Sequence, residues 1–157
     1  MQIELIVIGK TDSKEVAALV ELYAKRVNHY CRFAVTTLPD LRNTRSLTPR
    51  QQRIAEGEAL LRQFREEDWV VLLDERGEEM RSLEFAAWLQ KRMNSGIRRL
   101  VLVIGGPYGF SEEVYARANG RWSLSRMTFS HQLVRALFAE QLYRAFAILN
   151  NDPYHHE

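Results

Sequence analysis

Short apolar runs alternate along the chain with longer stretches in which apolar residues recur every three or four positions. Four runs rich in Val, Ile and Leu predict buried strands at residues 3–8, 33–38, 69–73 and 100–104. The stretches between them have the spacing of helices that bury one face. This alternation predicts an α/β fold with an open, mostly parallel sheet and helices on both of its faces.

Two of the predicted helices carry start signals. Asp12, with Glu15 three positions later, has the pattern of a capping box at the start of the first helix. Thr48 is followed by Pro49 and then by Gln51, which predicts a capped second helix.

The part of the chain after the third predicted helix is the most varied. Residues 99–131 combine a buried strand, a glycine loop, a short helix, a second short strand and a second loop. The helix that follows, residues 132–150, is apolar around much more than one face. One face of a sheet cannot cover so much apolar surface, so we expect a homodimer that buries this helix against a second copy. The alternative is a central helix that the chain buries by itself.

Chain length and amino-acid composition limit the class of protein. With 157 residues, 46% of them hydrophobic, the chain suffices for one domain, residues 1–157, but not for two independent cores. The first residues lack the basic segment of a signal peptide, and no apolar run approaches the roughly twenty residues of a membrane span. A single cysteine, Cys31, excludes an internal disulfide and suits a reducing cytoplasm. We therefore expect a cytoplasmic protein with no membrane partner, and no spacing of His, Cys, Asp and Glu predicts a metal site.

Basic and acidic residues form blocks along the chain. Residues 41–65 carry six Arg, residues 66–84 carry eight acids, and residues 91–135 carry eight basic residues. Of the 22 Lys and Arg residues 18 are Arg, whose planar fork suits phosphate. Solvated helix faces and genomic base composition explain such blocks more simply, so the charge permits nucleic acid binding without demonstrating it.

Ligands of open α/β sheets bind beyond the carboxyl ends of the strands, which here are the loops after Leu73, Ile104 and Leu124. The glycine loop 105–109 is the most informative of these, because glycines let the backbone approach a flat ligand closely. Taken alone it is a weak signal, since most glycine-rich turns are only turns. The Gly-Lys-Thr sequence at 9–11 is not a P-loop, because Glu4 stands where that motif needs glycine.

Two longer motifs are more specific in combination. A strand ending in IGGPxG at residues 104–109 is followed, at residues 122–157, by WSLSxMTxxHxLxRxxxxEQLYRAxxIxxxxPYHxE. Together they resemble the SPOUT class of RNA methyltransferases and, within it, the ribosomal large-subunit methyltransferase H family. The resemblance spans essentially the whole chain.

This resemblance implies a C-terminal trefoil knot, an exception to the usual rule against knots, and a homodimer. It also implies methylation of N3 of a pseudouridine in 23S ribosomal RNA, on assembled ribosomes, with S-adenosylmethionine as the cofactor. The family's cofactor-binding positions fall on Leu73, Gly105, Leu124, Ser125, Arg126, Met127, Thr128 and Phe129. These positions lie in the three loop regions in which a ligand is expected.

The implied reaction needs positioning more than it needs reactive side chains, because a sulfonium is already an excellent methyl donor. Arg144 and His155 are our candidates for positioning the target base, and His155 or Glu157 for accepting its proton. Arg144 can instead simply pair with Glu140, which lies four positions earlier on the same helix.

Two positions depart from the family's usual pattern. Ser130 stands where Pro usually precedes the His of the last helix, and His156 stands where Arg or Lys usually follows Tyr-His. The second change makes the charge of the tail depend on pH. Two other hypotheses stay open: a non-enzymatic protein that binds the ribosome or RNA, and a nucleotide-binding fold with another small ligand. Binding of S-adenosylmethionine separates the methyltransferase from both.

Overall fold

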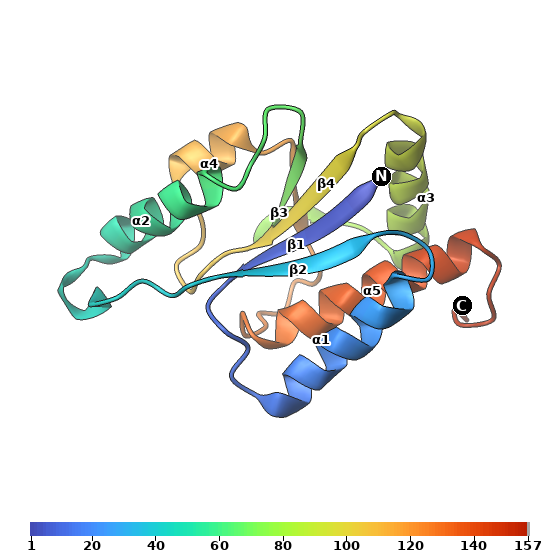
Figure 1. Ribbon diagram of the computed structural model, residues 1–157, viewed down its shortest axis with the longest axis horizontal. Coiled ribbons are helices and arrows are strands. Elements are labelled where there is room, and N and C mark those ends of the chain that lie inside the picture. Colours follow the sequence, from blue (N-terminus) through green and yellow to red (C-terminus); the bar gives the residue numbers. More distant parts are fainter. Residues whose placement is uncertain (157) are drawn as a thin grey trace.

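A parallel sheet with the strand order β2-β1-β4-β3-β5 forms the centre of the computed structural model, which describes residues 1–156 (Figure 1). In chain order the elements are β1 (Gln2–Ile8), α1 (Lys14–Val27), β2 (Phe33–Leu38), a short 3₁₀ helix (Thr44–Ser46), α2 (Pro49–Leu61), β3 (Trp69–Glu79), α3 (Ser82–Asn94), β4 (Arg99–Ile104), α4 (Glu112–Arg117), β5 (Gly120–Ser123) and α5 (Leu133–Leu149). All four strand pairs of this sheet are parallel. The predicted α/β class with an open parallel sheet is therefore confirmed.

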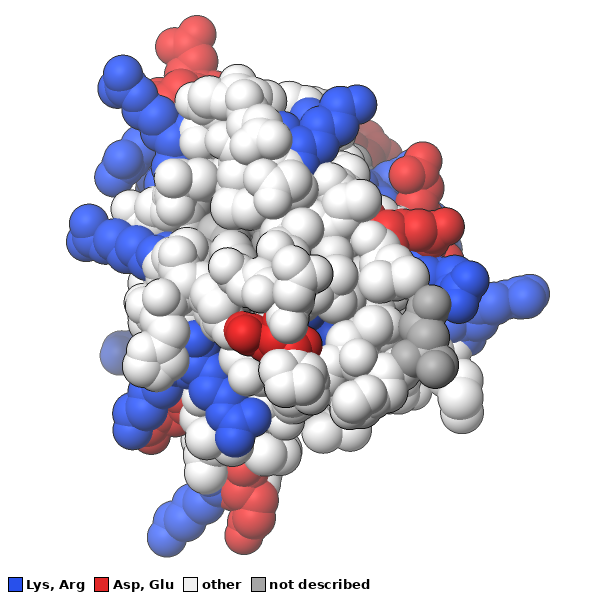
Figure 2. Space-filling model, turned by 90° about the vertical axis from the view of Figure 1, so that its right-hand side faces the viewer, with Lys and Arg blue, Asp and Glu red and all other residues white. Residues whose placement is uncertain are grey.

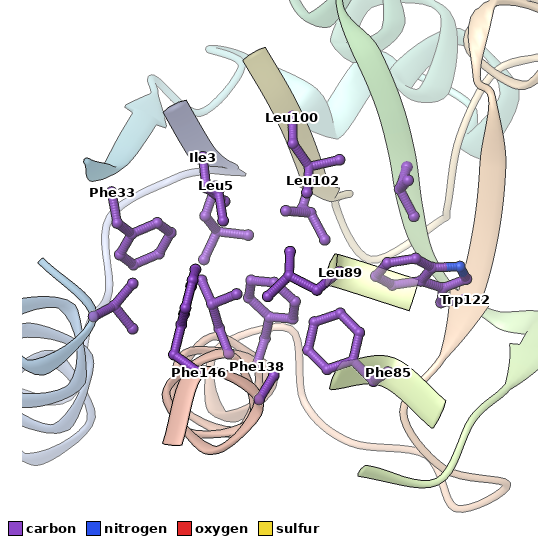
Figure 3. Packing of buried hydrophobic residues seen from close by; sticks show 14 of the residues in the cluster. Ile3, Leu5, Phe33, Phe85, Leu89, Leu100, Leu102, Trp122, Phe138 and Phe146 are labelled. Atoms are coloured by element: carbon purple, nitrogen blue, oxygen red, sulfur yellow. The ribbon is translucent and has the colours of Figure 1, made fainter. Parts of the chain in front are cut away.

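Helices cover both faces of the sheet, as the sequence predicted. In Figure 1, α1, α3 and α5 lie on one face, and α2 and α4 lie on the other. Successive residues of a strand point to opposite faces. Leu5 and Leu102 therefore pack with Phe138 of α5, whereas Ile6 and Val103 belong to the cluster that α2 and α4 cover. Figure 3 shows the first cluster, in which aromatic side chains of α3 and α5 lie against the strands.

β3 is longer than predicted. A turn was expected after Leu73, but the strand continues to Glu79 with a shift in register. Leu73 and Glu78 both pair with Trp122 of β5, so the residues between them bulge out of the ladder. Gly77 permits this, because a Cβ atom there would lie 2.6 Å from the backbone nitrogen of Trp122.

One of the two predicted helix starts is confirmed and the other is corrected. Thr48 and Gln51 form a reciprocal capping box with Pro49 at the first helical position. The first helix, in contrast, is capped by the hydroxyl of Ser13, and Asp12 does not cap it. The prediction of Asp12 was wrong because neighbouring Asp and Ser residues are equally good caps in sequence.

α5 is the central helix of its layer. It packs against both α1 and α3, and Phe138 and Leu142 are completely buried. The chain therefore buries much of this apolar helix by itself, as in the second of the two interpretations. The homodimer and the trefoil knot remain predictions that follow from the resemblance. Within residues 1–156, none of the helices has the length and apolarity that crossing a bilayer requires.

Arg135, in the first turn of α5, joins the start of this helix to the end of β1. Only 1% of the residue is exposed. Its guanidinium donates to the carbonyl oxygen of Ile8 at 2.7 Å, to that of Gly9 at 2.8 Å and to the hydroxyl of Thr11 at 3.0 Å. Its Nε donates to the carbonyl oxygen of His131 at 3.1 Å. One side chain thus connects the β1–α1 turn with the loop that precedes α5.

Gln132 reinforces this connection. Its amide nitrogen donates to the carbonyl oxygen of Lys10 at 3.0 Å, and its amide oxygen accepts from the backbone nitrogen of Asp12 at 2.9 Å. Burial lowers the pKa of Arg135, while the carboxylates of Asp12 and Asp40 oppose that effect. The connection therefore relies on several oxygen acceptors around a buried cation.

Arg135→Met should lower the free energy of unfolding by about 3 kcal/mol, because it leaves buried carbonyl oxygens without donors. Arg98→Met, at an exposed position, is the matched control and should change it by less than about 0.5 kcal/mol. Urea unfolding followed by circular dichroism measures both. Equal stabilities of the two variants would show that Arg135 does not hold the segments together.

Candidate functional site

A cavity of about 530 Å³ lies beyond the carboxyl ends of β3, β4 and β5. Its walls are the bulged part of β3, the loops that follow β4 and β5, and side chains of three helices, Arg53 of α2, Tyr115 of α4 and Val134 of α5. The volume falls within the range of roughly 300–1,000 Å³ that is typical of small-molecule sites. The sheet therefore forms a cavity at the edge where the sequence predicted one.

Seven of the eight residues that the resemblance assigned to the cofactor line this cavity. They are Leu73, Gly105, Leu124, Ser125, Met127, Thr128 and Phe129. The eighth, Arg126, is exposed and is not part of the wall. The structure thus brings together a residue of β3 and residues of two loops, and it leaves the Arg126 side chain in solvent.

The glycine loop forms one side of the cavity. A Cβ atom at Gly105 would lie 3.0 Å from the ring of Phe110, so a side chain here would have to displace that ring. Gly109 has a φ of +78°, which favours glycine, and its nitrogen donates to the carbonyl oxygen of Gly106 at 3.2 Å. The loop therefore lines the cavity with backbone atoms.

The loop after β5 forms the opposite side. The hydroxyl of Ser123 donates to the carbonyl oxygen of Ser125, and the Ser125 hydroxyl accepts from the backbone nitrogen of Met127. These bonds hold a tight turn whose apolar side chains stay accessible. Met127 is 74% exposed and Phe129 is 37% exposed, so both can pack on a flat ligand.

Two polar residues of the cavity were not predicted from the sequence. The Tyr115 hydroxyl donates to the carboxylate of Asp74, and both residues line the cavity. Burial and this carboxylate raise the pKa of Tyr115 to about 12, so the phenol stays protonated. Tyr115 also packs edge-on against Phe110, with ring centroids 5.8 Å apart. Nothing in the sequence indicated that α4 and the end of β3 would meet here.

The candidate catalytic residues Arg144 and His155 lie together, but outside this cavity. Nη1 of Arg144 is 3.3 Å from Nδ1 of His155. Nε of Arg144 donates to Oε1 of Glu140 at 3.1 Å, and the hydroxyl of Tyr154 donates to the same oxygen at 3.0 Å. Hydrogen bonding to Glu140 raises the pKa of Arg144. The third candidate, Glu157, lies outside the described residues.

The contact between Arg144 and His155 fixes how the histidine can act. A guanidinium can only donate hydrogen bonds, so Nδ1 of His155 must be the acceptor and its proton sits on Nε2. Among residues 1–156, Nε2 has no hydrogen-bond partner. Nε2 is also shielded from solvent, so His155 can donate to a target base only after neighbouring groups move, and its Nδ1 is free only after Arg144 moves away.

The pairing of Arg144 with Glu140 was the plainer of the two interpretations of this helix. The structure contains that pair, as an ion pair four residues apart. It also contains the contact with His155, so the two interpretations are compatible. No group of three or more His, Cys, Asp or Glu residues within residues 1–156 could hold a metal ion.

Comparison with known proteins extends these observations. Residues 1–155 match the family described as "Predicted SPOUT methyltransferase". Proteins named ribosomal RNA large subunit methyltransferase H are similar over their full length. Those of Christiangramia forsetii, Porphyromonas gingivalis and Flavobacterium johnsoniae are 56%, 55% and 52% identical over 156, 157 and 157 residues, covering 99%, 100% and 100% of each chain. Because the family match includes nearly every residue, this chain belongs to the SPOUT methyltransferase family.

Proposed function

We propose that this chain methylates large-subunit ribosomal RNA with S-adenosylmethionine, and that its target is N3 of a pseudouridine in 23S ribosomal RNA on assembled ribosomes. The observation that carries the proposal is the cavity at the carboxyl edge of the sheet, with seven of the expected cofactor residues in its wall. Similarity to named ribosomal RNA methyltransferases over the full length supports the substrate class. The hypothesis of a non-enzymatic RNA-binding protein is disfavoured by membership of a methyltransferase family.

The cavity wall suits an adenosyl ligand. Backbone groups of the glycine loop can hydrogen-bond the edge of an adenine, because Gly105 has no side chain in the way. Leu73 and Leu124 offer apolar surface to the faces of the ring. Such a wall binds by shape and backbone, and it requires no charged group in contact with the base.

When bound, S-adenosylmethionine supplies an electrophilic methyl group. The protein then has to hold the target nitrogen in line with that methyl and help the imide N–H lose its proton. Thr128 and Phe129 lie on the loop that closes the cavity, so we assign them to orienting the reacting groups. No covalent intermediate is needed for this chemistry.

Arginines near the cavity suit a phosphate backbone. Arg53 and Arg76 are part of the cavity wall, and Arg126 is exposed on the loop between two lining residues. Arg pairs well with phosphate because its fork can donate two parallel hydrogen bonds. We propose that these three residues hold the RNA while the target base enters the cavity.

We further propose that a second copy of the chain completes the site. Arg144 and His155 lie outside the cavity wall of their own chain, so a homodimer through the C-terminal helix could bring them to the partner's cavity. The face with α3, the C-terminal end of α5 and the tail has few Lys, Arg, Asp or Glu side chains at its centre and more around its margin (Figure 2). Such a face suits burial between two copies. In this proposal residues 1–157 act as one domain, in the cytoplasm where ribosomes are.

Transfer of labelled methyl from S-adenosylmethionine tests the proposed reaction. Ribosomes and naked 23S ribosomal RNA, both from cells that lack this gene, are incubated with the protein. We expect label on ribosomes but not on naked RNA, and mass spectrometry should find it on N3 of a pseudouridine. No label on either substrate, with an active control enzyme present, would refute the proposal. Label on naked RNA alone would refute the requirement for assembled ribosomes.

His155→Ala should lower the rate of methyl transfer by at least about tenfold, because the base would lose a positioning hydrogen bond. The dissociation constant for S-adenosylmethionine should stay within about twofold, since His155 does not line the cavity. His29→Ala, which removes an exposed histidine after α1, is the control and should change neither value. A parallel loss of cofactor affinity in His155→Ala would contradict this division of roles.

A further inference from the structure

The glycine loop rests on a buried carboxylate that the proposed reaction does not use. Glu56 belongs to α2, on the face of the sheet that α2 and α4 share, and only 5% of the residue is exposed. Neither the glycine motif nor the C-terminal motif includes this residue. A buried Glu is unusual, since carboxylates are rarely buried without a partner.

Close helix packing brings Glu56 to the loop. A Cβ atom at Gly57, the next residue of α2, would lie 3.0 Å from Cβ of Ser111, which caps α4. The helix can therefore sit directly against the segment that follows the glycine loop. A Cβ atom at Gly106 would lie 2.7 Å from Oε1 of Glu56 and closer still to Oε2. Gly106 lines the cavity, so one glycine backbone separates this carboxylate from the ligand space.

The carboxylate is only partly satisfied. Oε1 accepts a hydrogen bond from Nε2 of Gln52 at 3.0 Å. Among residues 1–156, Oε2 is shielded from solvent and has no hydrogen-bond partner. When ionised, this carboxylate lacks compensation, so a cation that enters the cavity would favour the ionised form and be attracted to it.

The titratable and charged groups around Glu56 come from two other segments and from its own helix. Asp40, after β2, adds negative charge, and His131 lies before α5. Arg53, one turn earlier on α2, points to the cavity wall. Burial and Asp40 raise the pKa of Glu56, while the Gln52 hydrogen bond and His131 oppose that effect.

We propose that Glu56 selects the charge of the cofactor's sulfur, favouring the positive sulfonium of S-adenosylmethionine over the neutral thioether of S-adenosylhomocysteine. The inference rests on the proposed function, because it takes the cavity to be the cofactor site. In methyl transfer the carbon–sulfur bond breaks while a bond forms between the methyl carbon and the target nitrogen, which gives up its proton. Both electrons of the broken bond stay on sulfur, so the sulfur loses its positive charge. The attraction to Glu56 then disappears, which favours release of the product. Glu56 is in this sense a positioning residue that acts across Gly106 and does not touch the substrate.

If Glu56 selects the sulfonium, the affinity for S-adenosylmethionine should change with pH in a definite direction. The sulfonium favours ionised Glu56, so cofactor binding displaces a proton wherever Glu56 is protonated in the free protein. Affinity for S-adenosylmethionine should therefore rise with pH as Glu56 ionises, above the ordinary value of 4.5. Affinity for S-adenosylhomocysteine should lack this component, because its sulfur is neutral.

Calorimetric titration of both ligands into the wild-type protein, Glu56→Gln and Glu58→Gln tests the inference. Glu58 lies two residues further along α2 and is exposed, so Glu58→Gln makes the same charge change in solvent. We expect Glu56→Gln to lower the affinity ratio of S-adenosylmethionine to S-adenosylhomocysteine by about tenfold and to remove its pH dependence. Glu58→Gln should change neither the affinity ratio nor its pH dependence.

Because the affinities for S-adenosylmethionine and S-adenosylhomocysteine are measured on the same protein, their ratio distinguishes charge selection by Glu56 from a purely structural role. A poorly folded Glu56→Gln would bind both ligands less well and leave their ratio unchanged, and that result would overturn the inference. If the wild-type protein binds both ligands and Glu56→Gln has the same affinity ratio as the wild type, the inference is overturned. The proposed function would then still stand. Failure of the wild-type protein to bind either ligand would overturn the proposed function and the inference together.

Discussion

The hydrogen bonds of Arg135 are the constraint on which the candidate site depends. A single buried guanidinium binds the end of β1, the β1–α1 turn and the segment before α5. Because the loop 124–132 is fixed to the sheet at one end by β5 and at the other by Arg135, it stays over the carboxyl ends of β3 and β4. The cavity exists because these ends are held together. Arginine suits this role since it offers five donors and remains charged when buried.

In the function we propose, cofactor binding and base positioning are separate. Loops, part of β3 and a few polar side chains form the cavity, and the polar cluster around Arg144 and His155 lies elsewhere on the chain. A sulfonium needs little activation, so a cavity made by backbone and shape is sufficient for it. The buried carboxyl group of Glu56 lies beneath Gly106, close to this cavity. In the function we propose, a second copy supplies the residues that hold the target base.

Local sequence patterns predicted the parts of the structure that depend on local physics. The apolar runs at β1, β2 and β4 gave strands within one residue of their observed bounds, and the family motif indicated the cavity loops. Local sequence patterns did not predict the features that depend on long-range packing. The bulge of β3 at Gly77 needs the approach of Trp122, and the burial of Glu56 needs the contact of α2 with α4. The broad apolar surface of α5 predicts an interface between copies, and α1 and α3 cover much of that surface within one chain; the interface itself stays a prediction.

Binding of S-adenosylmethionine in the carboxyl-edge cavity can be observed residue by residue. We would record the backbone amide resonances of the ¹⁵N-labelled protein during titration with S-adenosylmethionine. We expect the amides of Gly105, Gly106 and Gly109 to shift together with those of residues 124–129. The amide of Gly96, in the turn between α3 and β4, should not shift. Shifts confined to other parts of the chain, or none at millimolar cofactor, would show that the cofactor does not bind in this cavity.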